Sequence, residues 1–359
     1  MTGTAGAKDH TAATEVVDME KYHLDARANA DIDELVRELT RDLSSVHEAA
    51  FHRRAAVLAH ELPRELRKAL VGFRLTEPSG GFLLSGIRIG EEIGPTPADW
   101  HQPAGVVSPA LREESVFVLC AQLLGDPFGY ATLQNGLMMH DIVPIQGHEK
   151  EQISSGSEET LEWHTEEAFH PHRADYTALM CLRNPYGAPT TYAEISDLDI
   201  TEADRATLRQ PLFATRPSGS HSAERNAYTT HLPKSRHALA KESFDRIEEQ
   251  HRNPPTVSVL FGDEADPYLC VDPDCMTPLT EEAAGALERL CAEINRKLQD
   301  VNLTPGDILF LDNNSAIHGR RPFKARFDGS DRWLKRMNIT RDLRRSRSRR
   351  LSADDRVVR

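Results

Sequence analysis

Three residues could together hold a metal ion: His164 and Glu166 stand two positions apart, and His318 lies far downstream. An extended backbone points alternate side chains to the same side, so His164 and Glu166 would face one way and Thr165 the other. Two imidazoles and one carboxylate can bind one face of a ferrous ion and leave the opposite face open for a cosubstrate and dioxygen. These residues therefore predict a non-haem iron site, and the lack of a cysteine among them argues against structural zinc.

Two apolar segments would carry these residues to the rim of a β-sheet. Residues 176–183 form an apolar run soon after His164, and residues 305–314 combine a Pro-Gly turn with an apolar strand that leads to His318. Taken alone, a His-x-Glu spacing is a weak signal in a chain with 16 His and 56 acidic residues, and it also fits an exposed polar strand end. The two strands favour the metal site over that alternative.

Other sequence periodicities predict strands around this site and helices beside them. Residues 31–43, with Asp31 as N-cap, and residues 280–300, with Thr280 as N-cap, have helical spacing. Further helices are expected at 53–73 with a restart at Pro63, at 114–126 and at 201–213, and further strands at 81–89 and 333–341, with a hairpin at 257–272. The expected fold class is mainly β with flanking α, a distorted double-stranded β-helix (jelly roll).

The 359 residues contain no convincing linker, which predicts one body. We expect a flexible N-terminus at 1–28, a single oxygenase domain at 29–345 and a basic flexible tail at 346–359, with a polar surface insertion at 216–255.

Composition limits the compartment and the partners. The net charge of −13 argues against nucleic acid as the main partner, because phosphate contacts need a basic surface. The five cysteines are scattered and form no C-x-x-C pair, which predicts a reducing cytoplasm without disulfides. No segment reads as a signal peptide or approaches the roughly 18 apolar residues of a membrane span. A small-molecule partner is therefore expected, with a homodimer left open.

Arg332 lies fourteen positions beyond His318, on the approach to the last expected strand. A guanidinium group pairs bidentately with carboxylates and stays charged, so Arg332 could hold the far carboxylate of a dicarboxylate cosubstrate. From spacing alone, a surface cation beside the basic tail is the favoured interpretation.

Four segments are similar to those of a known enzyme family: WHTEEAFHPHRADY, LRNPYGAPTT, DNNSAIHGRRPF and DGSDRWLKRMNITRDL. Together they resemble the clavaminate synthase-like Fe(II)/2-oxoglutarate-dependent oxygenases, and most of all the L-arginine hydroxylases of peptide-antibiotic biosynthesis of the viomycin, streptothricin and enduracididine type. The resemblance extends from about residue 61 to residue 347. It implies the jelly-roll fold, Fe(II), 2-oxoglutarate and O₂.

The resemblance also implies a role for each matching residue. His164, Glu166 and His318 match the iron ligands, while Arg332 and Thr191 match residues that bind 2-oxoglutarate. The residues that match the substrate site are Gln134, Ser154, Glu166, Asp272, Asp274 and Arg336.

Asp272 and Asp274 could offer paired acceptors to a planar cation. Without the resemblance, Asp-Pro-Asp would be predicted as a turn; with it, the two acids are expected to bind a guanidinium group. Residues 216–221 (RPSGSH) depart from the arginine 3-hydroxylases, which have acidic residues there. The segment that covers the substrate is therefore expected to differ.

The predicted activity is Fe(II)/2-oxoglutarate-dependent hydroxylation of an unactivated C3 or C4 carbon of free L-arginine in antibiotic biosynthesis. The alternatives within this class are hydroxylation of a cyclised arginine derivative (enduracididine or capreomycidine) or of asparagine. The alternatives from other classes are a non-catalytic metal or amino-acid binding protein and a metal-dependent isomerase. The paired acids favour a guanidino substrate, Arg332 favours a dioxygenase, and Glu166 argues against a halogenase.

Overall fold

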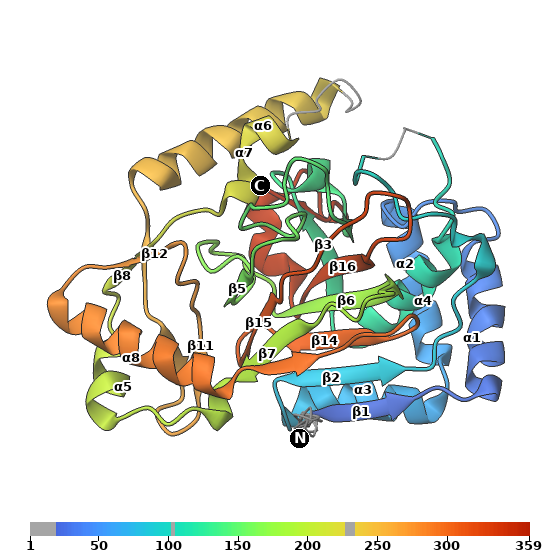
Figure 1. Ribbon diagram of the computed structural model, residues 1–359. Coiled ribbons are helices and arrows are strands. Elements are labelled where there is room, and N and C mark those ends of the chain that lie inside the picture. Colours follow the sequence, from blue (N-terminus) through green and yellow to red (C-terminus); the bar gives the residue numbers. More distant parts are fainter. Residues whose placement is uncertain (1–18, 102–104, 227–233) are drawn as a thin grey trace, which may run out of the picture.

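The computed structural model describes residues 19–101, 105–226 and 234–359. Two facing β-sheets lie between two groups of helices (Figure 1). The major sheet contains, in spatial order, β1 (Glu20–His23), β2 (Gly81–Ser85), β14 (Ile308–Asp312), β6 (Tyr176–Arg183), β16 (Trp333–Thr340), β3 (Asp126–Tyr130) and β17 (Val357–Val358), with β4 (Met139–Ile142) also paired to β16. The minor sheet contains β13 (Gln299–Val301), β7 (Thr190–Glu194), β15 (Ala316–Arg320) and β5 (Leu161–His164).

Helices cover the outer faces of both sheets (Figure 1). The helices against the major sheet are α1 (Ala26–Leu39), α2 (Ala49–Leu58), α3 (Arg64–Thr76) and α4 (Leu111–Ala121). The elements against the minor sheet include α5 (Glu202–Leu208), α8 (Glu281–Lys297), the small sheet of β8 (Phe213–Thr215), β9 (Thr256–Val257) and β12 (Met276–Pro278), and the hairpin of β10 (Leu260–Gly262) and β11 (Pro267–Leu269). The expected insertion contains α6 (Ala223–Asn226) and α7 (Lys234–Arg252). The short 3₁₀ turns are η1 (Ala59–Glu61), η2 (Glu91–Ile93), η3 (Gln134–Gly136), η4 (Ile195–Asp197), η5 (Gly219–His221) and η7 (Leu343–Arg349).

Alternating side chains of β14 join the layers of the fold. Ile308 and Phe310 pack in the core under the helices, whereas Leu309 and Leu311 pack between the sheets. This two-sided burial explains why the strand is apolar at every position up to Asp312 rather than alternating with polar residues. The predicted mainly β architecture with flanking helices matches this arrangement. No helix in the described part of the chain is both long enough and apolar enough to cross a membrane.

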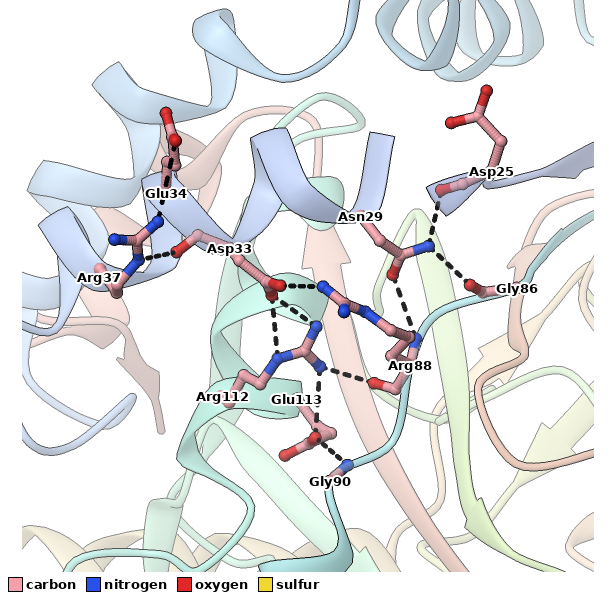
Figure 2. A network of polar contacts seen from close by, with 10 residues as sticks. All are labelled: Asp25, Asn29, Asp33, Glu34, Arg37, Gly86, Arg88, Gly90, Arg112 and Glu113. Carbon is pink, nitrogen blue, oxygen red and sulfur yellow. Dashed lines mark hydrogen bonds and ion pairs between the residues drawn. The ribbon is translucent and has the colours of Figure 1, made fainter. Parts of the chain in front are cut away.

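An ion-pair network ties α1 to α4 and to the loop after β2 (Figure 2). Asp33 accepts from Arg112 Nε at 3.0 Å and Nη2 at 2.6 Å, and it also pairs with Arg88. Glu113 in turn accepts from the Gly90 amide at 2.9 Å. These contacts fix the N-terminal helix on the scaffold behind the major sheet.

Helix α1 begins earlier than the sequence indicates. Asp25, in extended conformation, accepts from the Ala28 amide at 2.7 Å and is the N-cap, whereas Asp31 lies inside the helix. The N-cap prediction at Asp31 is therefore wrong, because Asp25 offers an equivalent carboxylate six residues earlier. The cap of α8 is confirmed: Thr280 accepts from the Ala283 amide at 3.1 Å.

The expected flexible segments also differ from the structure at both ends. Residues 1–18 lie outside the described residues, but β1 and the start of α1 already pack within 19–28. In the expected tail, Arg350 is 3% exposed and donates to carbonyl oxygens of Ala353 and Asp355 at 2.8 and 2.7 Å. β17 pairs in parallel with β3. The basic segment is thus folded onto the sheet, since its own backbone supplies the acceptors that solvent would otherwise provide.

A buried lysine joins α4 to the major sheet. Lys335 is 1% exposed and pairs with Glu114 at 2.8 Å and with Asp141 at 2.6 Å. Asp141 also accepts from Trp333 Nε1 at 2.6 Å. Lys335→Met is expected to lower the free energy of unfolding by about 3–5 kcal/mol, because two buried carboxylates lose their cation.

Urea denaturation followed by circular dichroism would measure this loss. The matched control is Lys324→Met at an exposed position, where the expected change is within about 0.5 kcal/mol. Equal denaturation midpoints for the two variants would contradict the stabilising role of Lys335.

Candidate iron and substrate site

The three predicted metal ligands meet at the end of the minor sheet. β5 ends at His164, and antiparallel pairing with β15 places His318 directly opposite it. Glu166 follows two residues later. One ligand atom from each of the three residues lies within 4.8 Å of the other two, and the Oε2 atom of Glu166 is 3.5 Å from His318 Nε2 and 4.0 Å from His164 Nε2. The strand pairing therefore brings together residues that are more than 150 positions apart.

These side chains are prepared to bind a cation. His164 Nδ1 lies 2.8 Å from the Glu162 carbonyl oxygen, and a hydrogen on Nδ1 leaves the lone pair on Nε2, toward the cluster. Glu166 is 2% exposed, and its Oε2 atom has no hydrogen-bond partner among the described residues. Burial lowers the pKa of His318, which favours the neutral imidazole that metals require. Two imidazoles and one carboxylate fit Fe(II).

Arg336 balances the charge of Glu166 from β16. Its Nη1 atom lies 2.6 Å from Glu166 Oε1, on the oxygen that does not face the histidines. Burial alone would raise the pKa of Glu166, but Arg336 and His318 outweigh it, so the pKa is lowered. Glu166 is therefore ionised at neutral pH and can serve as a ligand.

A buried pair of arginines lies beside the metal cluster. Arg332 is 5% exposed and donates from Nη2 to Thr190 Oγ1 at 3.1 Å, while its Nε atom has no partner within the described part of the chain. Burial lowers the pKa of Arg332 to about 10. Burial and the charge of Arg332 lower the pKa of Arg320 to about 9. Arg320 donates to the carbonyl oxygens of Gly156 and Glu159, and neither arginine has a carboxylate partner among the described residues. Two such buried cations favour an anionic ligand beside them.

The hydroxyl beside Arg332 belongs to Thr190 rather than to Thr191. In the pairing of β7 with β15, Thr190 lies opposite Arg320 and Thr191 lies opposite Gly319. Successive residues of a strand face opposite sides, so Thr191 points away from the face that carries Arg320 and His318. The prediction at Thr191 is corrected by one residue.

The predicted substrate residues lie around two adjoining cavities. The first is lined by, among others, Ser154, His164, Glu166, Asp272, Asp274 and Arg336. Burial raises the pKa of Asp272. The second cavity shares Ser154 and Arg336 with the first and adds Gln134, whose side-chain amide bonds both backbone groups of Asp141. The predicted substrate residues thus line these two cavities, His164, Glu166 and His318 form the metal cluster, and Arg332 bonds Thr190.

Comparison with known proteins assigns the chain to a family. Residues 113–338 match the family described as taurine catabolism dioxygenase TauD, TfdA family. The chain belongs to the TauD/TfdA family of dioxygenases. It is 47% identical over 339 residues to the enduracididine beta-hydroxylase of Streptomyces hygroscopicus, which covers 94% of this chain and 98% of the relative. It is 43% identical over 344 residues to the L-ornithine/L-arginine 3-hydroxylase of Catenulispora acidiphila, covering 95% and 100%.

A solved structure extends this likeness to the whole fold. The non-heme iron oxygenase OrfP, in complex with Fe, succinate and (3S)-hydroxy-L-Arg, superposes with a TM-score of 0.87 at 36% identity, covering 95% of this chain and 100% of OrfP. OrfP has also been solved with Fe and alpha-ketoglutaric acid. The predicted jelly-roll fold, the enzyme class and the cofactors Fe(II), 2-oxoglutarate and O₂ are therefore confirmed for this TauD/TfdA dioxygenase.

Three residues of this TauD/TfdA dioxygenase were not expected at the site from the sequence. Arg320 stands two positions after His318, and the same alternation that joins His164 to Glu166 could have indicated it. Asn313 holds the Glu166 backbone, accepting from its amide at 2.6 Å and donating to its carbonyl oxygen at 3.0 Å. Thr190 could be found only from the strand register.

Proposed function

We propose that this dioxygenase hydroxylates the C3 or C4 carbon of free L-arginine or a close guanidino relative in antibiotic biosynthesis. The observation that carries the proposal is the position of Asp272 and Asp274 in the same cavity as the iron ligands and Arg336. One cation and two carboxylates at opposite ends of a substrate complement the α-carboxylate and the guanidinium of arginine. OrfP, bound to hydroxylated L-arginine, supports this choice.

Each residue has a defined task in this proposal. Fe(II) with 2-oxoglutarate and O₂ supplies the oxidising power to convert C–H into C–OH while 2-oxoglutarate becomes succinate and CO₂. His164, Glu166 and His318 would hold the metal, and Arg332 with Thr190 would hold the far carboxylate of 2-oxoglutarate.

The substrate would be held at both ends. Arg336 would bind its carboxylate, Gln134 and Ser154 would orient its amino-acid head, and the Oε1 atom of Glu166 would accept from its ammonium group. Asp272 and Asp274 would hold the guanidinium. Because both ends are fixed, a small shift of either clamp changes which carbon faces the metal.

A cyclised guanidino amino acid is the second candidate substrate. The 47% identity to enduracididine beta-hydroxylase favours it, and a cyclic guanidinium offers the same charge to Asp272. Asparagine is disfavoured, since a neutral amide would leave the two acids without a cation. A non-catalytic binding protein is disfavoured because it has no use for buried Arg332 beside an open metal face.

Product analysis distinguishes these substrates. The protein with Fe(II) and 2-oxoglutarate would be supplied with L-arginine, L-enduracididine, capreomycidine and L-asparagine, and products would be identified by mass spectrometry and NMR. We expect a gain of one oxygen atom on a guanidino amino acid at C3 or C4. Turnover of asparagine alone would contradict the proposal.

Asp272→Ala is expected to raise KM for L-arginine by roughly tenfold to a hundredfold, because a charge-assisted hydrogen bond to the substrate is lost. KM for 2-oxoglutarate should stay within about twofold. Steady-state succinate release at varied L-arginine measures the effect, with exposed Asp266→Ala on the nearby β10–β11 hairpin as the control. An unchanged KM in Asp272→Ala would place guanidinium recognition elsewhere.

The proposal also includes the setting of the enzyme. We infer one oxygenase domain that contains residues 29–345 together with β1 and β17, acting in the cytoplasm on a small molecule and not on nucleic acid or a membrane, as a monomer or a homodimer. The free thiols of all five cysteines and the net charge of −13 support this setting.

A further inference from the structure

Glu167 has an unusual backbone beside the metal site. It directly follows the metal ligand Glu166, its φ is +53°, and it is 9% exposed. Residues other than glycine rarely adopt this left-handed conformation, which costs on the order of 1 kcal/mol or more and persists where the surroundings impose it. The same residue lines the cavity that contains Asp272 and Asp274.

A fully buried histidine holds the Glu167 side chain. His221, at the end of η5, has 0% exposure; its Nε2 atom lies 2.5 Å from Glu167 Oε2 and its Nδ1 atom lies 2.7 Å from Thr132 Oγ1. When the Thr132 hydroxyl donates to Nδ1, Nε2 carries the hydrogen and donates to Glu167. One imidazole ring then satisfies both contacts and holds the Glu167 carboxylate in place.

Aromatic neighbours fix the imidazole ring. The His221 ring packs edge-on against Phe169, with centroids 5.0 Å apart at 83°, and against Tyr130 at 6.2 Å and 70°. A ring held by two hydrogen bonds and two aromatic contacts has little freedom to rotate. The position of the Glu167 carboxylate is therefore set before any ligand enters.

Carboxylates outnumber cationic groups among the residues that line this cavity. Its lining residues include five carboxylates, namely those of Glu162, Glu166, Glu167, Asp272 and Asp274, and one guanidinium, that of Arg336. Arg336 is already paired with Glu166. From η5 and its N-cap, the cavity lining adds only the neutral hydroxyls of Ser220 and Ser218. A buried carboxylate in such surroundings is stabilised by a cationic ligand.

We propose that Glu167 is a third carboxylate for the side-chain cation of the substrate and that His221 is the positioning residue that holds it. The inference rests on the proposed function, because it concerns the same cavity. A guanidinium group has five N–H donors, whereas Asp272 and Asp274 together accept four hydrogen bonds if each binds bidentately. One donor is therefore left for Glu167. Glu167 would bind the cation from the side of the metal, whereas half-buried Asp272 and exposed Asp274 bind it from the outer side.

Ligand affinity tests the role of Glu167. Calorimetric titration of the Fe(II)- and 2-oxoglutarate-loaded protein, with oxygen excluded so that no turnover occurs, would compare L-arginine with L-citrulline, which replaces the guanidinium by a neutral urea. Glu167→Gln should weaken L-arginine binding by about tenfold or more, with little change for L-citrulline. The matched control is Glu162→Gln, which removes an exposed carboxylate from the same cavity and should change L-arginine binding less than about threefold.

His221→Phe tests the positioning role, because it keeps the aromatic packing and removes both hydrogen bonds. It should weaken L-arginine binding by about threefold to tenfold, and the double variant with Glu167→Gln should be no weaker than Glu167→Gln alone. Affinity for 2-oxoglutarate should be unchanged in every variant. A variant with a disturbed fold would lose affinity for 2-oxoglutarate as well.

Three outcomes would overturn the inference. One is L-arginine binding by Glu167→Gln within twofold of the starting protein; another is an equal loss for both ligands; the third is a Glu162→Gln variant as weak as Glu167→Gln. A starting protein that binds no cationic amino acid would overturn the proposed function together with this inference, so the two failures are distinguishable.

Discussion

His164→Ala is expected to abolish succinate release dependent on L-arginine. The variant keeps Glu166 and His318 but removes one of the three proposed protein ligands of the metal. Loss of groups that merely orient a ligand already costs about 10–100-fold in metal affinity or activity, so removal of the ligand itself should exceed a hundredfold. Iron content after dialysis and succinate formation would be measured together, and both should fall.

The matched control is His172→Ala. This partly exposed histidine lies eight residues after His164, beyond the end of β5, and is not part of the metal cluster. It should retain iron and activity within about threefold. Undiminished turnover by His164→Ala would refute the ligand assignment and with it the iron site.

Arg332→Gln is expected to raise KM for 2-oxoglutarate by roughly 30-fold or more. The variant keeps a polar side chain but shortens it and removes a buried charge, and truncating one partner of a desolvated charge pair costs about 2 kcal/mol or more. KM for L-arginine should change far less, because Asp272, Asp274 and Arg336 are untouched. Succinate release at varied 2-oxoglutarate measures the effect.

Arg321→Gln supplies the control, since Arg321 is 40% exposed and pairs with Asp300 at the surface at 2.8 Å. It should leave both KM values within about twofold. If Arg332→Gln has the same KM for 2-oxoglutarate as this control, then Arg320 or another group holds the cosubstrate.

The chemistry of the site could be predicted from the sequence because it follows short-range rules. The spacing of His164 and Glu166 indicates a shared face by alternation alone, and the strand of residues 176–183 has the bounds of β6. The cap at Thr280 lies beside a strongly amphipathic helix, so its position is defined locally.

The remaining features depend on contacts that the sequence does not display. Thr190 and Thr191 are chemically equal, and only the pairing of Thr190 with Arg320 decides which of them faces the site. Asp25 and Asp31 are equally good caps, and the packing of α1 selects the first. Arg350 belongs to a segment whose charge indicates solvent exposure, yet nearby backbone carbonyls hold it in the interior.

The parallel pairing of β17 with β3 has a consequence for how the molecule meets copies of itself. β3 would otherwise present a row of open amide and carbonyl groups, and such a margin invites strands from other chains to add on. The final residues occupy that margin, with Arg356 pairing to Asp126 at 3.1 Å to hold them there. By pairing with β3, Val357 and Val358 reduce the edge that a strand of another molecule could bind.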